Sequence, residues 1–109
     1  MRAAVLAVAA AVIVCVINLT AGERPKPKTY TVTMENMRFQ PETLTVTRGD
    51  TIVWVNKDLV AHTATSPAGG FDSGVIQAEK SWRLTVQKKG DFAYVCTFHP
   101  TMTAMLRVK

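Results

Sequence analysis

Residues 90–102 read GDFAYVCTFHPTM, and this stretch decides how the rest of the chain is interpreted. Residues 92–96 are rich in aromatic and β-branched side chains, which favours a strand, and a Gly-containing turn signal precedes them at 88–91. Residues 104–108 predict a closing strand. A loop therefore joins the last two strands, and a thiol, an imidazole and a thioether fall within seven residues there.

Short β patterns separated by turns fill the chain from residue 29 onward. The density of Gly and Pro in SPAGGFDSG predicts a loop over 66–74, and residues 77–80 suit one helical turn. About seven short strands at this spacing predict an all-β fold, an antiparallel Greek-key β-sandwich. The other candidate strands are residues 29–34, 44–47, 51–55, 62–65 and 82–86.

The first 21 residues have the pattern of a secretory signal. Arg2 gives a basic start, and 15 consecutive apolar residues follow at positions 3–17. That run is long for a signal peptide and short for a membrane span. Ala21 ends an imperfect small-residue cleavage site. We expect an exported, periplasmic protein, soluble after cleavage or tethered by residues 1–21 as an N-terminal anchor.

A spacer of alternating Pro and Lys occupies residues 22–28, so the folded domain is predicted over 29–109. The net charge of the whole chain is +5, and Arg2 is the only charged residue among the first 21. The basic residues are scattered, without a basic stripe interleaved with aromatics, which argues against nucleic-acid binding. A mildly basic domain favours a protein partner with an acidic or neutral surface.

Cysteine usage is the sharpest clue in the composition. Cys15 lies within the apolar leader, so the predicted domain holds a single cysteine, Cys96. Small exported domains often depend on disulfides, and an odd cysteine requires another explanation. It is an inert core thiol, half of an intermolecular bridge, or a metal ligand.

The neighbours of Cys96 favour the ligand interpretation. His99 and Met102 follow on the same loop, and His62 is the other histidine of the chain. Two His and one Cys with a weak axial Met form the ligand set of an electron-transfer copper site. Thiolate and thioether favour Cu(I), while imidazole serves both oxidation states. Met105 competes with Met102 but lies inside the predicted last strand.

The motif Cys-x-x-His-Pro-x-Met at 96–102 resembles that of the cupredoxins, and within them the short loop of the plastocyanin/amicyanin group. The segments WVNKDLVAHT, FDSG and GDFAYVC resemble cupredoxin segments in the expected order. The resemblance spans residues 29–109. It implies one type 1 copper, with His62 and His99 binding through imidazole, Cys96 through thiolate and Met102 axially.

Two positions depart from the common family pattern. Thr63 stands where many members have an Asn that ties the two ligand loops together, and its hydroxyl is expected to bond across instead. Phe98 stands where Pro is common. Both changes bear on the surroundings of the metal, which tune its properties.

The ligand set leaves no open position for a substrate, so we expect a monomeric one-electron carrier and not an enzyme. The resemblance implies electron exit through His99, where redox donor and acceptor proteins would dock. The surroundings predicted for this docking face are Pro67, Ala68, Phe98, Pro100 and Thr101. The alternative function is a copper carrier or buffer that delivers Cu(I) to an exported acceptor. A metal-free interaction module would leave the ligand spacing to chance.

Overall fold

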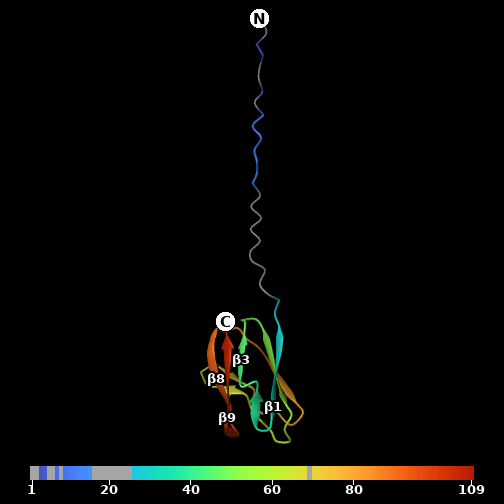
Figure 1. Cartoon of the computed structure of the whole chain (residues 1–109), viewed down its shortest axis with the longest axis vertical. Helices are drawn as coiled ribbons and strands as arrows, with labels where there is room; N and C mark the ends of the chain where they lie inside the picture. Colours follow the sequence, from blue (N-terminus) through green and yellow to red (C-terminus); the bar gives the residue numbers. More distant parts are fainter. Residues whose placement is uncertain (1–2, 5–6, 8, 16–25, 69) are drawn as a thin grey trace.

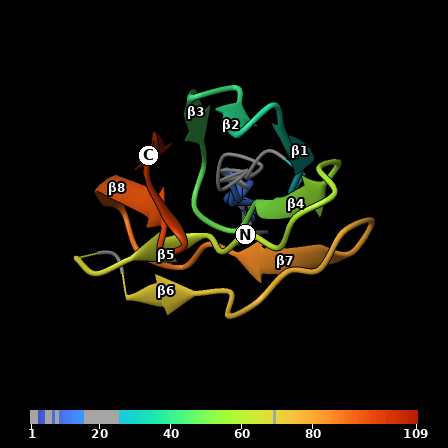
Figure 2. The same ribbon diagram turned by 90° about the horizontal axis from the view of Figure 1, so that it is seen from below.

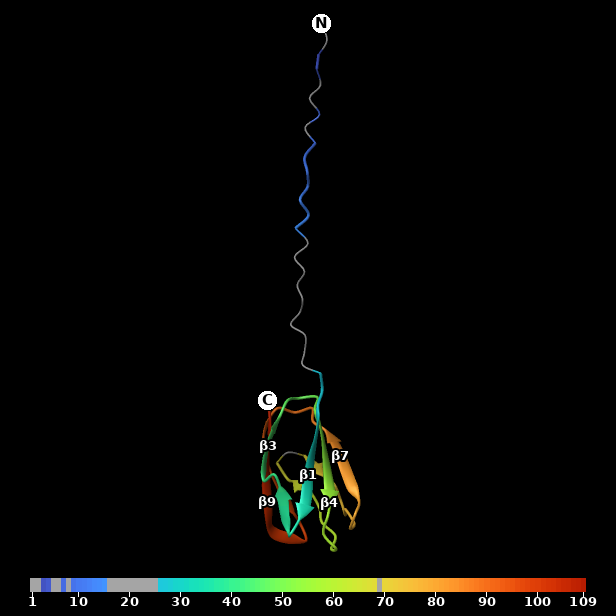
Figure 3. The same cartoon turned by 45° about the vertical axis from the view of Figure 1, so that its right-hand side comes forward.

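The computed structural model describes residues 3–4, 7, 9–15, 26–68 and 70–109, and this part of the chain forms nine β-strands and no helix. The strands lie in two facing layers (Figures 1 and 3). Their bounds are β1 (Thr29–Glu35), β2 (Arg38–Gln40), β3 (Thr43–Val46), β4 (Thr51–Asn56), β5 (Thr65–Ser66), β6 (Phe71–Asp72), β7 (Ser81–Thr85), β8 (Gly90–Cys96) and β9 (His99–Val108).

The two layers are sheets with strand orders β2-β1-β4-β7 and β3-β9-β8-β5-β6 (Figure 2). The expected all-β sandwich is confirmed, but the expectation of purely antiparallel sheets is wrong. β1 pairs with β4 in parallel, and β3 pairs with β9 in parallel. Each parallel pair forms because the chain passes through the other sheet before it returns and runs in the same direction as the earlier strand. A pattern of alternating residues does not reveal this path.

Strict alternation builds the core. In β4, Ile52 and Trp54 are fully buried while Thr51, Val53 and Val55, which alternate with them, are only half-buried, as the two-residue period of a strand requires. The Trp54 ring meets Tyr94 edge-on at a centroid distance of 5.7 Å, and the indole N–H donates to the Tyr94 hydroxyl at 3.3 Å. Phe39 packs against the same Tyr94 at 4.7 Å. These aromatic contacts join the two sheets beneath β8.

Four local expectations need correction. The segment 66–74 is not wholly a loop, because Ser66 ends β5 and β6 lies within it. Residues 77–80 form a hydrogen-bonded turn, with Lys80 N–H donating to Gln77 O at 3.0 Å, and no helical turn. The short strand β2 was not predicted. β9 starts at His99, five residues before the predicted start of that strand, because it pairs with β8 almost to its end.

About half of the predicted signal segment, residues 1–2, 5–6, 8 and 16–21, lies outside the described residues. Its cleavage remains a prediction. Within the ranges that are described, no helix is long and apolar enough to cross a membrane. β1 begins at Thr29, at the end of the domain where β9 brings the C-terminus (Figure 1).

Asp50 fastens this end of the domain. Its carboxylate accepts the backbone N–H of Lys28 at 2.8 Å and that of Thr47 at 2.9 Å. These two hydrogen bonds, which outweigh the opposing effect of burial, lower the pKa of Asp50 below its ordinary value of 3.8. A lowered pKa means that the ionised carboxylate stabilises the folded state above pH 3.8, and that this stabilisation is lost as the pH falls through the folded pKa.

We therefore expect Asp50→Asn to lower the free energy of unfolding near pH 7 by about 1 kcal/mol, because the amide keeps one acceptor of the two. The difference from the parent protein should be smaller at about pH 3, because the stabilisation by the ionised carboxylate is lost progressively as the pH falls below the ordinary pKa of 3.8. Urea unfolding at both pH values measures this. Asp91→Asn, an exposed position near the start of β8, is the control. An Asp50→Asn effect that is equal at both pH values would contradict the prediction.

Candidate metal centre

Two donors come from the turn between β8 and β9. Cys96 is the last residue of β8 and His99 is the first of β9, and the two are paired across the turn. The strand register shifts between Val95 and Cys96, a bulge that interrupts the alternation there. Both side chains consequently lie at one end of the sandwich, the end opposite to the C-terminus of β9.

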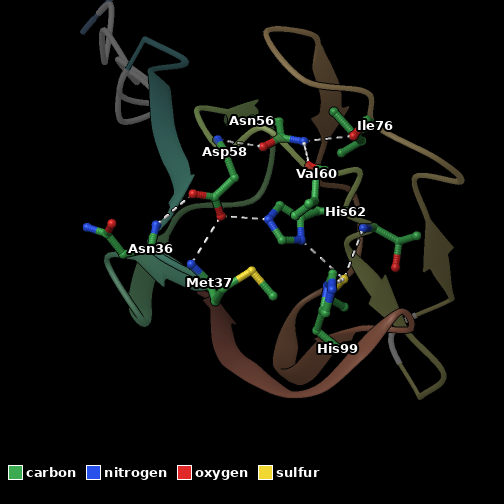
Figure 4. A network of polar contacts seen from close by, with 10 residues as sticks. Asn36, Met37, Asn56, Asp58, Val60, His62, Ile76 and His99 are labelled. Carbon is green, nitrogen blue, oxygen red and sulfur yellow. Dashed lines mark hydrogen bonds and ion pairs between the residues drawn. The ribbon is translucent and has the colours of Figure 1, made fainter.

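The third donor, His62, is held by the segment between β4 and β5. Its backbone forms a bridge with Ile76, with N–H···O distances of 3.1 and 2.8 Å. Asn56, fully buried at the end of β4, organises this segment (Figure 4). Its amide donates to Val60 O at 2.8 Å and to Ile76 O at 2.9 Å, and its side-chain oxygen accepts the N–H of Asp58. Nothing in the amino-acid sequence indicated this role of Asn56.

The three donors converge. Ligand atoms of His62, Cys96 and His99 all lie within 4.8 Å of one another. Nδ1 of each histidine is 3.6 Å from Sγ of Cys96. Donors bound to one ion at about 2.0–2.3 Å and roughly 120° apart would be separated by about 3.7 Å. The spacing of imidazole and thiol therefore fits a single trigonal ion, and the donor set suits copper.

Met102 lies within β9, and not on a loop before the strand as expected. It is buried, on the face of β9 that also buries Ala104 and Leu106. Met105 falls on the opposite face by the two-residue alternation and pairs with Ala93 and Thr43. Of the two methionines, Met102 is thus the one that shares a face with the core and lies nearer to His99. The arrangement of these four side chains is like that of a type 1 copper site.

Asp58 orients the His62 ring. Its Oδ2 is 2.7 Å from Nε2 of His62, whose side chain is fully buried, and the same carboxylate accepts the N–H groups of Asn36 and Met37 (Figure 4). Burial alone would raise the pKa of Asp58, but the hydrogen bonds from His62, Met37 and Asn36 lower it overall. An ionised acceptor at Nε2 keeps the proton there and leaves Nδ1 free to bind a metal. The only sequence signal for this role was a carboxylate four residues before the histidine.

Thr63 links the two ligand segments, as its hydroxyl was expected to do. Its Oγ1 accepts the backbone N–H of Thr97 at 2.9 Å and lies 3.0 Å from the Thr97 hydroxyl. Its own N–H donates to Sγ of Cys96 at 3.3 Å. The expected crosslink between the two segments is therefore present and is made by a hydroxyl.

Exposed apolar side chains surround this end of the molecule. Leu59 is 97% exposed and follows Asp58, and Phe98 is 51% exposed and precedes His99. Val60 and Met37 are also exposed. Pro67, expected near His99, instead lines a groove with Ala93 and Ala104, farther along the sheet from Cys96. We call Met37, Leu59, Val60 and Phe98 the apolar rim.

Comparison with known proteins agrees with this geometry. The family model "Cupredoxin-like domain" matches residues 5–108. The chain belongs to the cupredoxin-like family. Amicyanin from Paracoccus denitrificans is 28% identical over 83 residues, which cover 72% of this chain and 63% of the relative. Amicyanin from Paracoccus versutus is 25% identical over the same coverage. This cupredoxin thus spans less than two thirds of the length of these relatives.

Solved structures extend the likeness. A reduced proline-to-phenylalanine mutant of amicyanin matches with a TM-score of 0.69 and 26% identity, covering 74% of this chain and 82% of that one. A copper-containing nitrite reductase from Thermus scotoductus SA-01 also matches, with a TM-score of 0.69 and 27% identity, covering 79% of this chain but only 23% of the enzyme. The same fold thus occurs in a small cupredoxin and as part of a larger enzyme.

We expect Asp58→Ala to lower copper(II) affinity by about 10- to 100-fold, because the His62 ring loses the acceptor that fixes its proton and orientation. Competition titration with a chelator measures the affinity. Glu35→Ala makes the same change of charge at an exposed residue of β1 and is the control. Equal affinities in Asp58→Ala and Glu35→Ala would show that the carboxylate does not orient the ligand.

Proposed function

We propose that this cupredoxin is a one-electron carrier with one type 1 copper held by His62, Cys96, His99 and, axially, Met102. The observation that carries the proposal is the convergence of two imidazoles and one thiol within 4.8 Å, two of these residues being buried. Bound copper would supply the Cu(II)/Cu(I) couple. The protein's part is to hold four donors in one geometry that serves both oxidation states, so that little moves when the charge changes.

The proposed ligands differ in their access to solvent. His62 and Cys96 are fully buried, Met102 is buried, and His99 is half-buried. His99 is therefore the ligand through which an electron has the shortest path to a partner. We propose the apolar rim around it, together with Pro100 and Thr101, as the docking face for redox donor and acceptor proteins. A small apolar face suits a partner that must dissociate quickly.

The proposal includes export to the periplasm and excludes a catalytic role. Four protein donors leave no coordination position for a substrate, unlike catalytic metal sites that keep one open. β1 starts at the end of the domain opposite to the ligands, so an uncleaved N-terminal segment would leave the docking face free. We expect the domain to act as a monomer.

The visible spectrum is the first test. Addition of Cu(II) should give an intense band near roughly 600 nm that reductant bleaches reversibly, and Cys96→Ser should abolish it, because the band needs a thiolate ligand. Cys15→Ser should keep the band and serves as the control. Colourless protein that binds Cu(I) and passes the metal to a chelating acceptor would favour the delivery function. Absence of copper binding would refute both functions.

Docking through the apolar rim predicts a slow electron self-exchange in Leu59→Glu. Two copies would meet through the same face, so the variant places like charges in one contact, which costs about 1.4 kcal/mol or more and should slow exchange by roughly tenfold or more. NMR line broadening in mixtures of oxidised and reduced protein measures the rate. Gln87→Glu adds the same charge on the connection between β7 and β8, at the other end. Equal rates in the two variants would reject this docking face.

A further inference from the structure

The FDSG motif at 71–74 provides none of the proposed ligands, yet it runs antiparallel beside the segment that carries His62. β6 pairs with β5 through Thr65 and Asp72, and Ile76 pairs with His62. Between these two points, Ser73 N–H donates to Ala64 O at 3.0 Å. Residues 71–76 therefore form a strap along the outer edge of residues 62–66.

Ser73 completes the strap with its side chain. The N–H of Ala64, a fully buried residue, donates to the Ser73 hydroxyl at 2.8 Å instead of to a backbone carbonyl. The hydroxyl in turn donates to Gly74 O at 2.7 Å, which leaves its lone pairs for Ala64. The backbone turns away at this point, as the left-handed φ of +64° at Gly74 shows. The Ser73 hydroxyl therefore accepts the hydrogen bond from Ala64 N–H that a backbone carbonyl would accept in a regular strand pair.

The strap determines which way the next amide faces. Along an extended segment, successive N–H groups point to opposite sides. Because His62 and Ala64 direct their N–H groups to the strap, Thr63 directs its own to the other side, where it donates to Cys96 Sγ at 3.3 Å. Loss of the bond between Ala64 N–H and Ser73 would leave the backbone dihedral angles on both sides of Thr63 less constrained, so that its N–H would be held less firmly toward the sulfur.

We propose that Ser73 is a positioning residue for the thiolate, because its bond to Ala64 N–H holds the Thr63 N–H on Cys96 Sγ and so sets the reduction potential of the site. The inference rests on the proposed copper function. A hydrogen bond to a thiolate withdraws negative charge from the sulfur, which disfavours the more highly charged Cu(II). Weakening this bond lowers the potential.

The test compares Ser73→Ala with Ser73→Thr, which keeps a hydroxyl. In the copper-loaded protein, Ser73→Ala should lower the potential and shift the thiolate absorption band, and Ser73→Thr should restore both. Val46→Ala is the control for loss of stability alone, because Val46 is buried in β3 and pairs with Val108 at the far end of β9. A Ser73→Ala potential equal to that of the parent protein would overturn the proposal.

Hydrogen exchange in the copper-free protein provides a second readout. Ser73→Ala should speed exchange of the Thr63 and Ala64 amides by about tenfold or more. Val46→Ala should not speed exchange of these two amides more than that of the other amides. Within the parent protein, these two amides should open together with those of Ser73 and Ile76. Independent opening would overturn the proposal even if the Ser73→Ala chain fails to fold. Failure of the copper function appears separately, as a parent protein without a thiolate band.

Discussion

The hydrogen bond from Thr63 N–H to Cys96 Sγ is the contact on which the arrangement of the metal centre depends. It joins the β4–β5 segment to the end of β8, at a distance of 3.3 Å. Among the described residues, no buried side-chain nitrogen or oxygen lacks a hydrogen-bond partner. Asn56, Asp58 and Ser73 form hydrogen bonds with polar groups around the site. The sulfur of Cys96 and one nitrogen of each histidine then face a common point.

The sandwich explains why so few residues suffice to hold this site. Cys96 and His99 are fixed by the pairing of β8 with β9, and His62 by its bridge to Ile76 and by the buried end of β4. These supports belong to different sheets, which the aromatic cluster around Tyr94 joins beneath them. A site built on packed strands changes little in geometry with the charge of its ion, which is what rapid one-electron exchange requires.

Asp58 extends the site beyond the ligand segments. Its carboxylate contacts His62 and also accepts two N–H groups from Asn36 and Met37, whose φ angles of 53° and 59° are in the left-handed region. Such backbone is unfavourable for residues other than glycine and persists where its surroundings enforce it. The turn between β1 and β2 is thus fastened to the same carboxylate that orients the imidazole. Met37, whose side chain belongs to the apolar rim, is thereby held next to Asp58.

Much of the fold and of the candidate metal centre could be predicted from the sequence, because these features depend on local patterns. Alternation and turn signals predicted the β-sandwich, and the spacing of Cys96, His99 and Met102 predicted a metal centre of soft donors. The same patterns did not predict the parallel pairs β1–β4 and β3–β9, which depend on how the chain crosses between the layers. They also placed Met102 on a loop, because the bulge at Cys96 and the long pairing of β9 are tertiary features.

The fold class and the candidate donors follow from the amino-acid sequence alone, since strand period and ligand spacing are properties of short segments. The groups that support those donors are identified only in the folded chain. Asn56, Asp58 and Ser73 are ordinary polar residues in the sequence, and their partners lie on several segments that are distant from one another along the chain, such as Ile76 for Asn56, Met37 for Asp58 and Ala64 for Ser73. Buried polar groups need hydrogen-bond partners, and only the folded chain shows which partners come within reach.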